Sequence, residues 1–485
     1  MTPDDVEELA DALDADVPDA AREEFAAQFD AQDDLLAPLG DLDPAPAPDR
    51  DWWAPETDEY GAWLARCDIG NGSGPLDGLE VGVKDNVAVA GLPMTCGSPL
   101  LAEFTPREDA TVVTRLLDAG ARVVGKTNMD ELAFGGSRET MRLKVTDNPR
   151  NTDHQPGSSS AGSGAAVAAG EVPAAIGSDT GGSVRFPAAW CGVVGVKPTR
   201  GLVSHTGFVQ YAKTLDNVGV LAESTETAAR VLDAIAGEDP RDERTRGTTT
   251  EAYADATRDP PSDLTIGLPE ELFGNAPRLD DRVRDALADL EDAGATLVDI
   301  SIPDFEYAMP AWLAIGMSEV AAYVENRGVN QWLLSDADPD LADALNRALA
   351  DEDDAFGPPI LAARLYAEHL RRDRPADLAR ARRARRRVTA GVDDALADVD
   401  VLACTTVPML APAWGDDVED LFTALANTGP FNVSGHPAVS VPCGDVDGLP
   451  VGLQFVADRG SDATALAAAA RYEALGTNAY TAGGE

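Results

Sequence analysis

The stretch IGSDTGGSVRFPAAWCG, residues 176–192, sets Asp179, Gly181, Gly182, Ser183 and Arg185 within a largely apolar segment. An apolar residue opens it, and an apolar run over residues 186–190 nearly closes it. A buried charge is costly unless it is paired, so Asp179 and Arg185 are expected to form a buried ion pair that fixes the shape of the turn between them. That turn, which carries Ser183 behind two glycines, is therefore a candidate functional site.

Short strand-like runs alternate with helical ones on the N-terminal side of this stretch, from about residue 78 onwards. Residues 79–89 are typical of a strand pair or a strand and turn, residues 109–128 of a helix followed by a strand, and residues 164–178 of a small-residue helix followed by a strand. Such alternation is typical of a sheet that is covered by helices. The sequence therefore predicts an α/β fold with a large, mostly buried sheet and helices on both faces.

The N-terminal part of the sequence has a different pattern. Residues 1–40 have the periodicity of two acidic amphipathic helices, and the Pro-rich residues 40–56 indicate an extended linker. We therefore expect an acidic helical N-terminal extension and linker over residues 1–65. The main domain is expected over residues 66–475, with its core at 78–220 and a variable, largely helical insert at about 300–400.

Composition favours a cytoplasmic protein. No run of apolar residues approaches the ~18 that a membrane span needs, and the first residues are acidic and helical in pattern, unlike a secretory signal. The five cysteines are scattered, odd in number and without CxxC spacing, which favours free thiols in a reducing compartment.

The acidic balance is the strongest global feature. The chain holds 85 Asp and Glu residues against 38 Lys and Arg, for a net charge of −47. Self-repulsion of this size destabilises a compact state in dilute buffer, but molar salt shortens the Debye length to about 3 Å. We therefore expect an acidic surface adapted to high salt; an acidic surface that serves only solubility is the alternative. Because such a surface repels phosphates, direct binding of nucleic acid is not expected.

Two further features belong with the candidate site. Lys84 lies in the apolar run VGVKDNVAV, where burial of an ammonium group is costly and loss of its proton would make it a base; a lysine that extends to solvent is the alternative. The second feature is the loop PGSSSAGSG, residues 156–164. A neutral lysine that takes up the proton of Ser183 through a serine of this loop would activate Ser183 as a nucleophile. Gly181 and Gly182 would let backbone N–H groups stabilise an oxyanion.

Other common site types are not indicated. The serine loop lacks the lysine of a phosphate-binding loop, and the GxSxG elbow of α/β-hydrolases is absent. The four histidines lack metal-ligand spacing, so no metal site is predicted. We interpret His436, in the segment SGHPAV, as a turn or structural residue.

The chain resembles the amidase signature family from about residue 65 to 460. The resemblance rests on the segments VGVKDNVAVAGLPMTCGS, PGSSSAGSGAAVAAGEVPAAIGSDTGGSVRFPAAWCG and PFNVSGHPAVSVPCG. It implies the amidase signature fold, a large mixed β-sheet flanked by helices, and amide hydrolysis through an acyl-enzyme without a metal or organic cofactor. The family's Ser–cis-Ser–Lys triad falls on Ser183 as nucleophile, Ser159 as bridging serine and Lys84 as base.

The resemblance also assigns the residues around the triad. The oxyanion hole falls on Thr180, Gly181 and Gly182, and Asp179 and Arg185 take a structural role. The family's cis peptide bond falls between Ser158 and Ser159, where this chain has PGSSSAGS in place of the usual PGGSSGGS.

The resemblance implies two functions. The first is a stand-alone amidase acting on a small-molecule amide, because the N-terminal extension and the segment TGPFNVSGHPA are similar to the nitrile-pathway subgroup. The second is the A subunit of a glutamyl-tRNA(Gln) or aspartyl-tRNA(Asn) amidotransferase, a glutaminase that works with partner subunits. That subunit usually has an acidic residue at the position of Leu425 and a glutamine at that of Phe186, so we favour the first. Arg385 is a candidate for binding the carboxylate of glutamine, or one member of a solvated basic helix face.

The remaining expectations concern the pocket and the assembly. Phe186 follows the turn of residues 179–185, which carries the expected nucleophile Ser183 and is called the nucleophile turn below. Phe186 is expected to contact the substrate, and Trp190 to pack in the core. The resemblance suggests that the N-terminal helices mediate a homodimer. An inert binding protein on the same fold is a third alternative, against which the intact set of Lys84, Ser159 and Ser183 argues.

Overall fold

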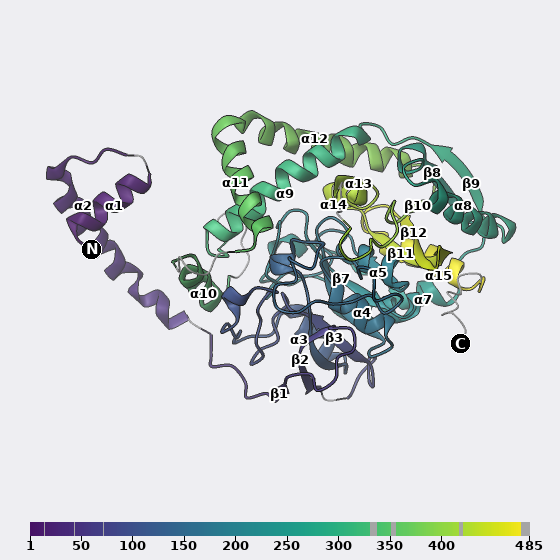
Figure 1. Ribbon diagram of the computed structural model, residues 1–485, viewed down its shortest axis with the longest axis horizontal. Coiled ribbons are helices and arrows are strands. Elements are labelled where there is room, and N and C mark those ends of the chain that lie inside the picture. The colour runs from purple at the N-terminus through teal and green to yellow at the C-terminus, as the bar shows by residue number, and fades with distance from the viewer. Residues whose placement is uncertain are drawn as a thin grey trace. The chain divides into compact units, whose positions relative to one another are not determined.

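The fold is described from a computed structural model of the chain (Figure 1). The residues described are 1–13, 15–42, 44–70, 72–329, 337–350, 356–416 and 421–476. The chain divides into two compact units, Met1–Pro46 and Ala47–Glu485.

The smaller unit is a pair of helices, α1 (Pro3–Ala12) and α2 (Asp19–Leu36), followed by the short 3-10 helix η1 (Ala37–Leu42). Thr2 caps α1: its hydroxyl accepts from the backbone of Asp5, and the Asp5 carboxylate accepts from the backbone of Thr2. Among its described residues, Val6, Ala10 and Ala26 are buried. The two helices lie within the range predicted for acidic helices.

A twelve-stranded mixed sheet forms the centre of the larger unit, as the resemblance implied. Its strand order is β1-β2-β4-β3-β5-β7-β6-β11-β12-β10-β8-β9. β3 pairs parallel with β4 and β5, whereas β5 pairs antiparallel with β7. The strands are β1 (Trp52–Trp53), β2 (Trp63–Ile69), β3 (Glu80–Lys84), β4 (Arg122–Thr127), β5 (Ala174–Asp179), β6 (Val194–Lys197), β7 (Asn217–Ala222), β8 (Thr265–Pro269), β9 (Thr296–Ile300), β10 (Val401–Thr405), β11 (Ala438–Val446) and β12 (Leu449–Val456).

Helices cover both faces of the sheet. Successive side chains of a strand point to opposite faces, and in β5 Ala174 and Ile176 join one apolar core while Ala175 joins another. The first core is completed by α3 (Thr111–Asp118), α6 (Thr225–Ile235), α7 (Tyr253–Arg258), α8 (Pro277–Asp292) and α15 (Asp462–Glu473). The second is completed by α4 (Ala161–Ala168) and α5 (Arg185–Cys191).

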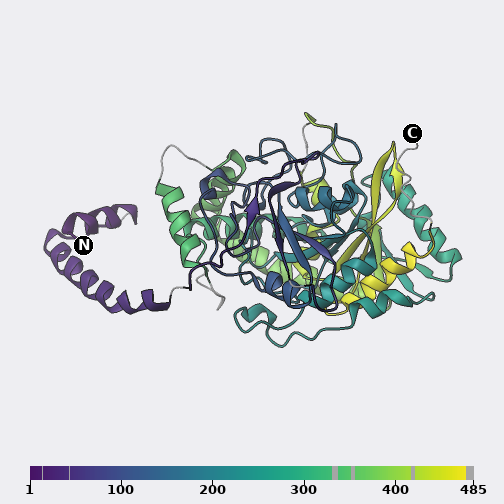
Figure 2. The ribbon, with the colours of Figure 1, turned by 90° about the horizontal axis from the view of Figure 1, so that it is seen from below.

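A separate helical layer lies beside the sheet, where the variable insert was expected. Helices α9 (Ala308–Glu325) and α12 (Pro375–Leu396) run side by side, with α11 (Pro358–Asp373) packed against them (Figures 1 and 2). Their apolar core includes Trp312 of α9 together with Phe186 and Leu425, so this layer reaches the nucleophile turn. Residues 330–336 and 351–355 of the expected insert lie outside the described residues. The helices are α9 (Ala308–Glu325), α10 (Pro339–Ala350), α11 (Pro358–Asp373), α12 (Pro375–Leu396), α13 (Leu421–Leu425) and α14 (Gly429–Ser434), and the remaining 3-10 turns are η2 (Pro99–Leu101), η3 (Glu131–Ala133), η4 (Glu243–Thr245), η5 (Glu270–Leu272) and η6 (Phe305–Tyr307).

The division between the units falls earlier than the expected boundary at residue 65. The reason is that Trp52 and Trp53 form a strand whose residues pair with Cys67 and Arg66, so this part of the expected linker joins the sheet.

The five cysteines, Cys67, Cys96, Cys191, Cys404 and Cys443, are free and buried. Among the helices of the described ranges, none has the length and apolar character required to cross a bilayer.

Candidate active site

The nucleophile turn, residues 179–185, connects the end of β5 to the start of α5. Gly182 has φ of +141°, and a Cβ atom there would lie 2.6 Å from Thr428 Oγ1, so both the conformation and the space require glycine. Ser183 follows it and is half-buried.

Asp179 and Arg185 hold the two sides of this turn together. The Arg185 guanidinium lies 2.8 Å from the Asp179 carboxylate, and both side chains are fully buried. Arg185 also donates to the carbonyl of Thr428 and to the side-chain oxygens of Asn432 and Gln454. Burial alone would raise the pKa of Asp179, but the charge and hydrogen bonds of Arg185 outweigh it and lower that pKa to about 2. The pair expected from the sequence is thus present, and it ties the turn to α14 and β12.

The amine of Lys84 is fully buried at the end of β3, so this lysine does not extend to solvent. Its Nζ donates to three hydroxyl groups, those of Ser159 at 2.8 Å and of Ser160 and Ser178 at 2.9 Å. Burial lowers the pKa of Lys84 to about 7, against the opposing charges of buried aspartates of which Asp130 contributes most. Near neutral pH a large fraction of this amine is therefore uncharged and able to accept a proton.

The serine loop, residues 156–164, contacts Lys84 through Ser159 and Ser160. The peptide bond between Ser158 and Ser159 is cis, at the position where the resemblance places one. Ser158 Oγ donates to the buried carboxylate of Asp130 at 2.8 Å, and the backbone N–H of Ser160 donates to the carbonyl of Ser183. A backbone hydrogen bond thus connects the serine loop to the nucleophile turn, which carries Ser183, while Ser159 of the same loop accepts a hydrogen bond from Lys84.

Side chains hold the carbonyl groups of the nucleophile turn. The carbonyl of Thr180 accepts from Trp312 Nε1 at 2.9 Å, and that of Gly181 accepts from the hydroxyl of Thr428. Within the described residues, the backbone N–H groups of residues 181–183 donate no hydrogen bond. These free donors lie in the wall of a cavity that Thr180 and Ser183 also line.

That cavity is mainly apolar. Its wall includes Phe134, Phe186, Trp312 and Leu425 together with the nucleophile turn, and none of its lining residues is charged. Tyr211 also lines it, and the buried Tyr211 hydroxyl has no hydrogen-bond partner among the described residues. The geometry offers a hydroxyl nucleophile, a neutral amine and oxyanion donors beside an uncharged pocket, which suits acyl transfer from an uncharged amide.

A family model described as Amidase matches residues 49–466 of the chain. This chain belongs to the amidase signature family. As a member of this family it is an amidase, a hydrolase of amide bonds.

The relatives of this amidase include amidotransferase A subunits and a peptide amidase. The A subunit of glutamyl-tRNA(Gln) amidotransferase from Halobacterium salinarum is 44% identical over 83% of this chain and 97% of the relative. The crystal structure of the same subunit from Thermotoga maritima matches with a TM-score of 0.71 at 32% identity, over 84% of this chain and 86% of that one. The peptide amidase of Stenotrophomonas maltophilia matches with a TM-score of 0.66 at 32% identity, over 83% of each chain.

Two residues bear on which substrate this amidase accepts. Leu425 lies in the cavity wall, where a Cβ atom on Gly181 would come within 2.9 Å of it. Arg385 does not line that cavity; its guanidinium donates to the Thr214 hydroxyl at 2.6 Å and to the Val433 carbonyl at 3.0 Å. Arg385 therefore connects α12 to α14 and to the loop that holds Thr214, a role that neither of its sequence interpretations included.

Several residues of this site were not identified from the sequence. Ser160 and Ser178 bind Lys84, and Ser178 lies within strand β5, where nothing in the sequence distinguished it from a structural residue. Asp216, whose carboxylate accepts from the Thr180 hydroxyl, and Trp312 are far from the signature segments in the sequence. Trp190, by contrast, packs against Phe186 with ring centroids 5.5 Å apart, in the supporting role that was expected.

Proposed function

We propose that this amidase cleaves its substrate through an acyl-enzyme on Ser183, with Ser159 as the proton relay and Lys84 as the base. The observation that carries this assignment is the buried Lys84 amine, which hydrogen-bonds only to hydroxyl groups among the described residues. An amine without a carboxylate partner has no ion pair to keep it protonated, so its proton affinity suits a general base.

The reaction begins with two proton transfers. Neutral Lys84 takes the proton of the Ser159 hydroxyl as Ser159 takes that of Ser183, and Ser183 Oγ attacks the amide carbonyl carbon. The free N–H groups of residues 181–183 stabilise the oxyanion, each donor contributing about 3 kcal/mol. Ser159 then protonates the leaving ammonia or amine, and the C–N bond breaks. Water attacks the resulting ester and loses its proton to the same relay, which releases the carboxylic acid and restores Ser183.

The cavity supports a small amide with an uncharged, mainly apolar acyl group as substrate. A charged acyl group would lose its hydration there without gaining a partner, because the lining residues include no charge. The unpaired Tyr211 hydroxyl supplies one polar contact that a substrate group would satisfy.

Glutamine hydrolysis within an amidotransferase is the second candidate, and the relatives favour it. The H. salinarum protein that is 44% identical to this chain has that name, as does the Thermotoga structure. What speaks against it is the cavity itself, because Leu425 and its neighbours offer no partner for the ammonium or carboxylate of free glutamine.

Ammonia release separates these candidates. The full chain is assayed in molar salt against a panel of small aliphatic and aromatic amides and against glutamine, alone and with amidotransferase partner subunits from the same organism. Turnover of uncharged amides by the chain alone supports the first candidate, and glutaminase activity that requires the partner subunits overturns it in favour of the second. An inert binding protein would release ammonia from neither.

The triad is tested on whichever amide is turned over. Ser183→Ala and Lys84→Ala are each expected to abolish the activity while the variants stay folded. Normal turnover by either variant would overturn the assignment.

A further inference from the structure

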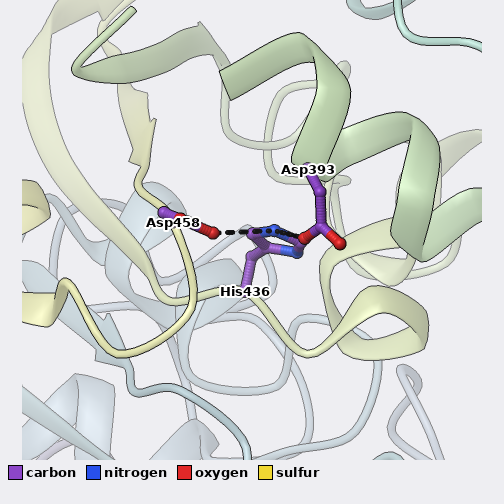
Figure 3. A group of neighbouring side chains, drawn as sticks. All are labelled: Asp393, His436 and Asp458. Atoms are coloured by element: carbon purple, nitrogen blue, oxygen red, sulfur yellow. Dashed lines mark ion pairs between the residues drawn. The ribbon is translucent and has the colours of Figure 1, made fainter. Parts of the chain in front are cut away.

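Three side chains from separate parts of the fold converge outside the catalytic cavity. Asp393 belongs to α12, His436 lies in the turn between α14 and β11, and Asp458 follows β12 (Figure 3). His436 Nε2 lies 3.1 Å from Asp393 Oδ1 and 3.8 Å from Asp458 Oδ1. One ring nitrogen and two carboxylate oxygens therefore face one another within 4.8 Å.

The ring of His436 is fixed in this orientation without a hydrogen bond on the nitrogen that faces the carboxylates. His436 is fully buried, and its Nδ1 lies 3.0 Å from the hydroxyl of Ser434. Its Nε2 has no hydrogen-bond partner of acceptable geometry among the described residues. Buried polar atoms are nearly always satisfied in native proteins, so this one calls for a ligand.

A cation between these atoms would satisfy all of them together. His436 Nε2 faces Asp393 Oδ1 at 3.1 Å and Asp458 Oδ1 at 3.8 Å, and it has no hydrogen bond of acceptable geometry to either. The other ring nitrogen already has the Ser434 hydroxyl as its partner, so Nε2 is the atom that is directed at the carboxylates.

We propose that Asp393, His436 and Asp458 form a binding site for a divalent transition-metal ion of the Zn²⁺ type. Zn²⁺ binds imidazole nitrogen and carboxylate oxygen at about 2.0–2.2 Å, which places two donors on one tetrahedral ion about 3.3 Å apart. The observed 3.1 Å between His436 Nε2 and Asp393 Oδ1 matches this separation. The 3.8 Å to Asp458 closes with a small rotation, since that side chain is 65% exposed. Solvent on the exposed side supplies a water as fourth ligand.

Arg459 is a cation that already contacts the cluster. Its Nη2 donates to both oxygens of Asp393, at 3.0 and 2.8 Å. A carboxylate has about four lone-pair positions, so Asp393 can bind a metal ion through Oδ1 and keep its bond to Arg459. In that arrangement Arg459 orients a metal ligand, as outer-shell partners commonly do.

A metal ion here would connect three segments that are distant in sequence. It would fix α12, which carries Arg385, to the turn after α14 and to the end of β12. Since α14 carries Asn432, which binds Asp179 and Arg185, the site reinforces the frame around the nucleophile turn. The expected role is therefore structural, and it does not depend on the proposed catalytic relay.

The test uses the full chain, freed of metal with a chelator, in about 1 M KCl to suppress weak binding to the acidic surface. Zn²⁺ is titrated by calorimetry into the wild type, Asp458→Asn and Asp394→Asn. Asp394 is the matched control, because it is the exposed neighbour of Asp393 on α12. Zn K-edge X-ray absorption of the loaded wild type reports whether an imidazole nitrogen is bound, and melting with and without Zn²⁺ reports stabilisation.

We expect one saturable Zn²⁺ per wild-type chain, an imidazole nitrogen in its coordination sphere and a raised melting temperature. Asp394→Asn should bind as the wild type does, whereas Asp458→Asn should bind at least about tenfold more weakly, because even outer-shell changes cost that much. Mg²⁺ in equal amount should not displace Zn²⁺, since imidazole favours transition metals. The proposal is overturned by the lack of a saturable site, by Asp458→Asn binding as tightly as the wild type, by purely oxygen ligation, or by displacement with Mg²⁺.

Discussion

Lys84 Nζ lies 2.8 Å from Ser159 Oγ, and both residues are fully buried. Ser160 Oγ lies almost as close, at 2.9 Å, on the adjacent residue. The amine therefore has two neighbouring hydroxyl groups of similar geometry, of which only the one on Ser159 is assigned to the relay.

This pair of serines allows a matched comparison. Ser159→Ala should lower kcat by at least about 100-fold, the lower range for loss of a general acid–base group. Ser160→Ala removes a hydrogen bond to the same amine but leaves the relay in place. Its kcat should therefore fall by a clearly smaller factor. Steady-state kinetics on one amide substrate, with melting curves to verify folding, measure both. Equal losses in the two variants would contradict the assignment of Ser159.

Activity should depend on pH through Lys84. Because burial lowers the pKa of Lys84 to about 7, the amine is neutral above this pH and protonated below it. Only the neutral form accepts a proton, so kcat/KM should rise with pH through about 7 and then level off. A profile measured from about pH 5.5 to pH 9 at constant salt checks this. A flat acid limb across pH 6–7 would show that Lys84 is not the titrating base.

Tyr211→Phe tests the polar contact of the cavity. The substitution removes only the buried hydroxyl, whose hydrogen-bonding capacity is unused among the described residues, so stability should be unchanged or slightly higher. If a substrate group bonds this hydroxyl, kcat/KM should fall about tenfold for amides that carry a polar acyl substituent and stay constant for purely apolar ones. Kinetics on a matched pair of amides give the ratio. An unchanged ratio would exclude Tyr211 as a specificity residue.

The ion pair around the nucleophile turn should be important for stability. Asp179→Asn leaves the Arg185 charge buried without its partner, which costs about 3–5 kcal/mol of unfolding free energy. The pKa of Asp179 is lowered from 3.8 to about 2, so its stabilisation is present above pH 3.8 and lost as the pH falls towards 2. Denaturant unfolding measures the loss, with Asp447→Asn as control because the Asp447–Arg278 pair is exposed and should contribute little. Equal effects of the two substitutions would refute the prediction.

The sequence predicted what depends on local pattern and left out what depends on long-range contacts. The mixed sheet and the convergence of Lys84, Ser159 and the nucleophile turn follow from segments that resemble the family closely. Trp312, which holds the Thr180 carbonyl, is 132 residues away and sits in a helix whose apolar pattern resembles ordinary core. Nothing in its neighbourhood marks it as part of a site.

His436 illustrates the same limit. Its segment indicated a turn. Its neighbours Asp393 and Asp458 come from an arginine-rich helix and an exposed loop, in a chain where aspartate is abundant. Spacing along the sequence cannot reveal a cluster that forms when three elements meet. The sequence also did not predict that the sheet begins at Trp52. The two residues of β1 are exposed and have no strand pattern of their own, and they belong to the sheet only through their pairing with β2.

The excess of acidic residues in the sequence leads to a prediction about salt. With a net charge of −47, mutual repulsion opposes the compact state, and it is screened when molar salt shortens the Debye length to about 3 Å. The melting temperature should therefore rise steeply between about 0.1 M and 2 M KCl. Sucrose is the control, because it strengthens burial by exclusion from the surface without screening charge, and it should restore only part of the stability at low salt. Stability that is the same at both salt concentrations would show that the acidic surface serves solubility alone.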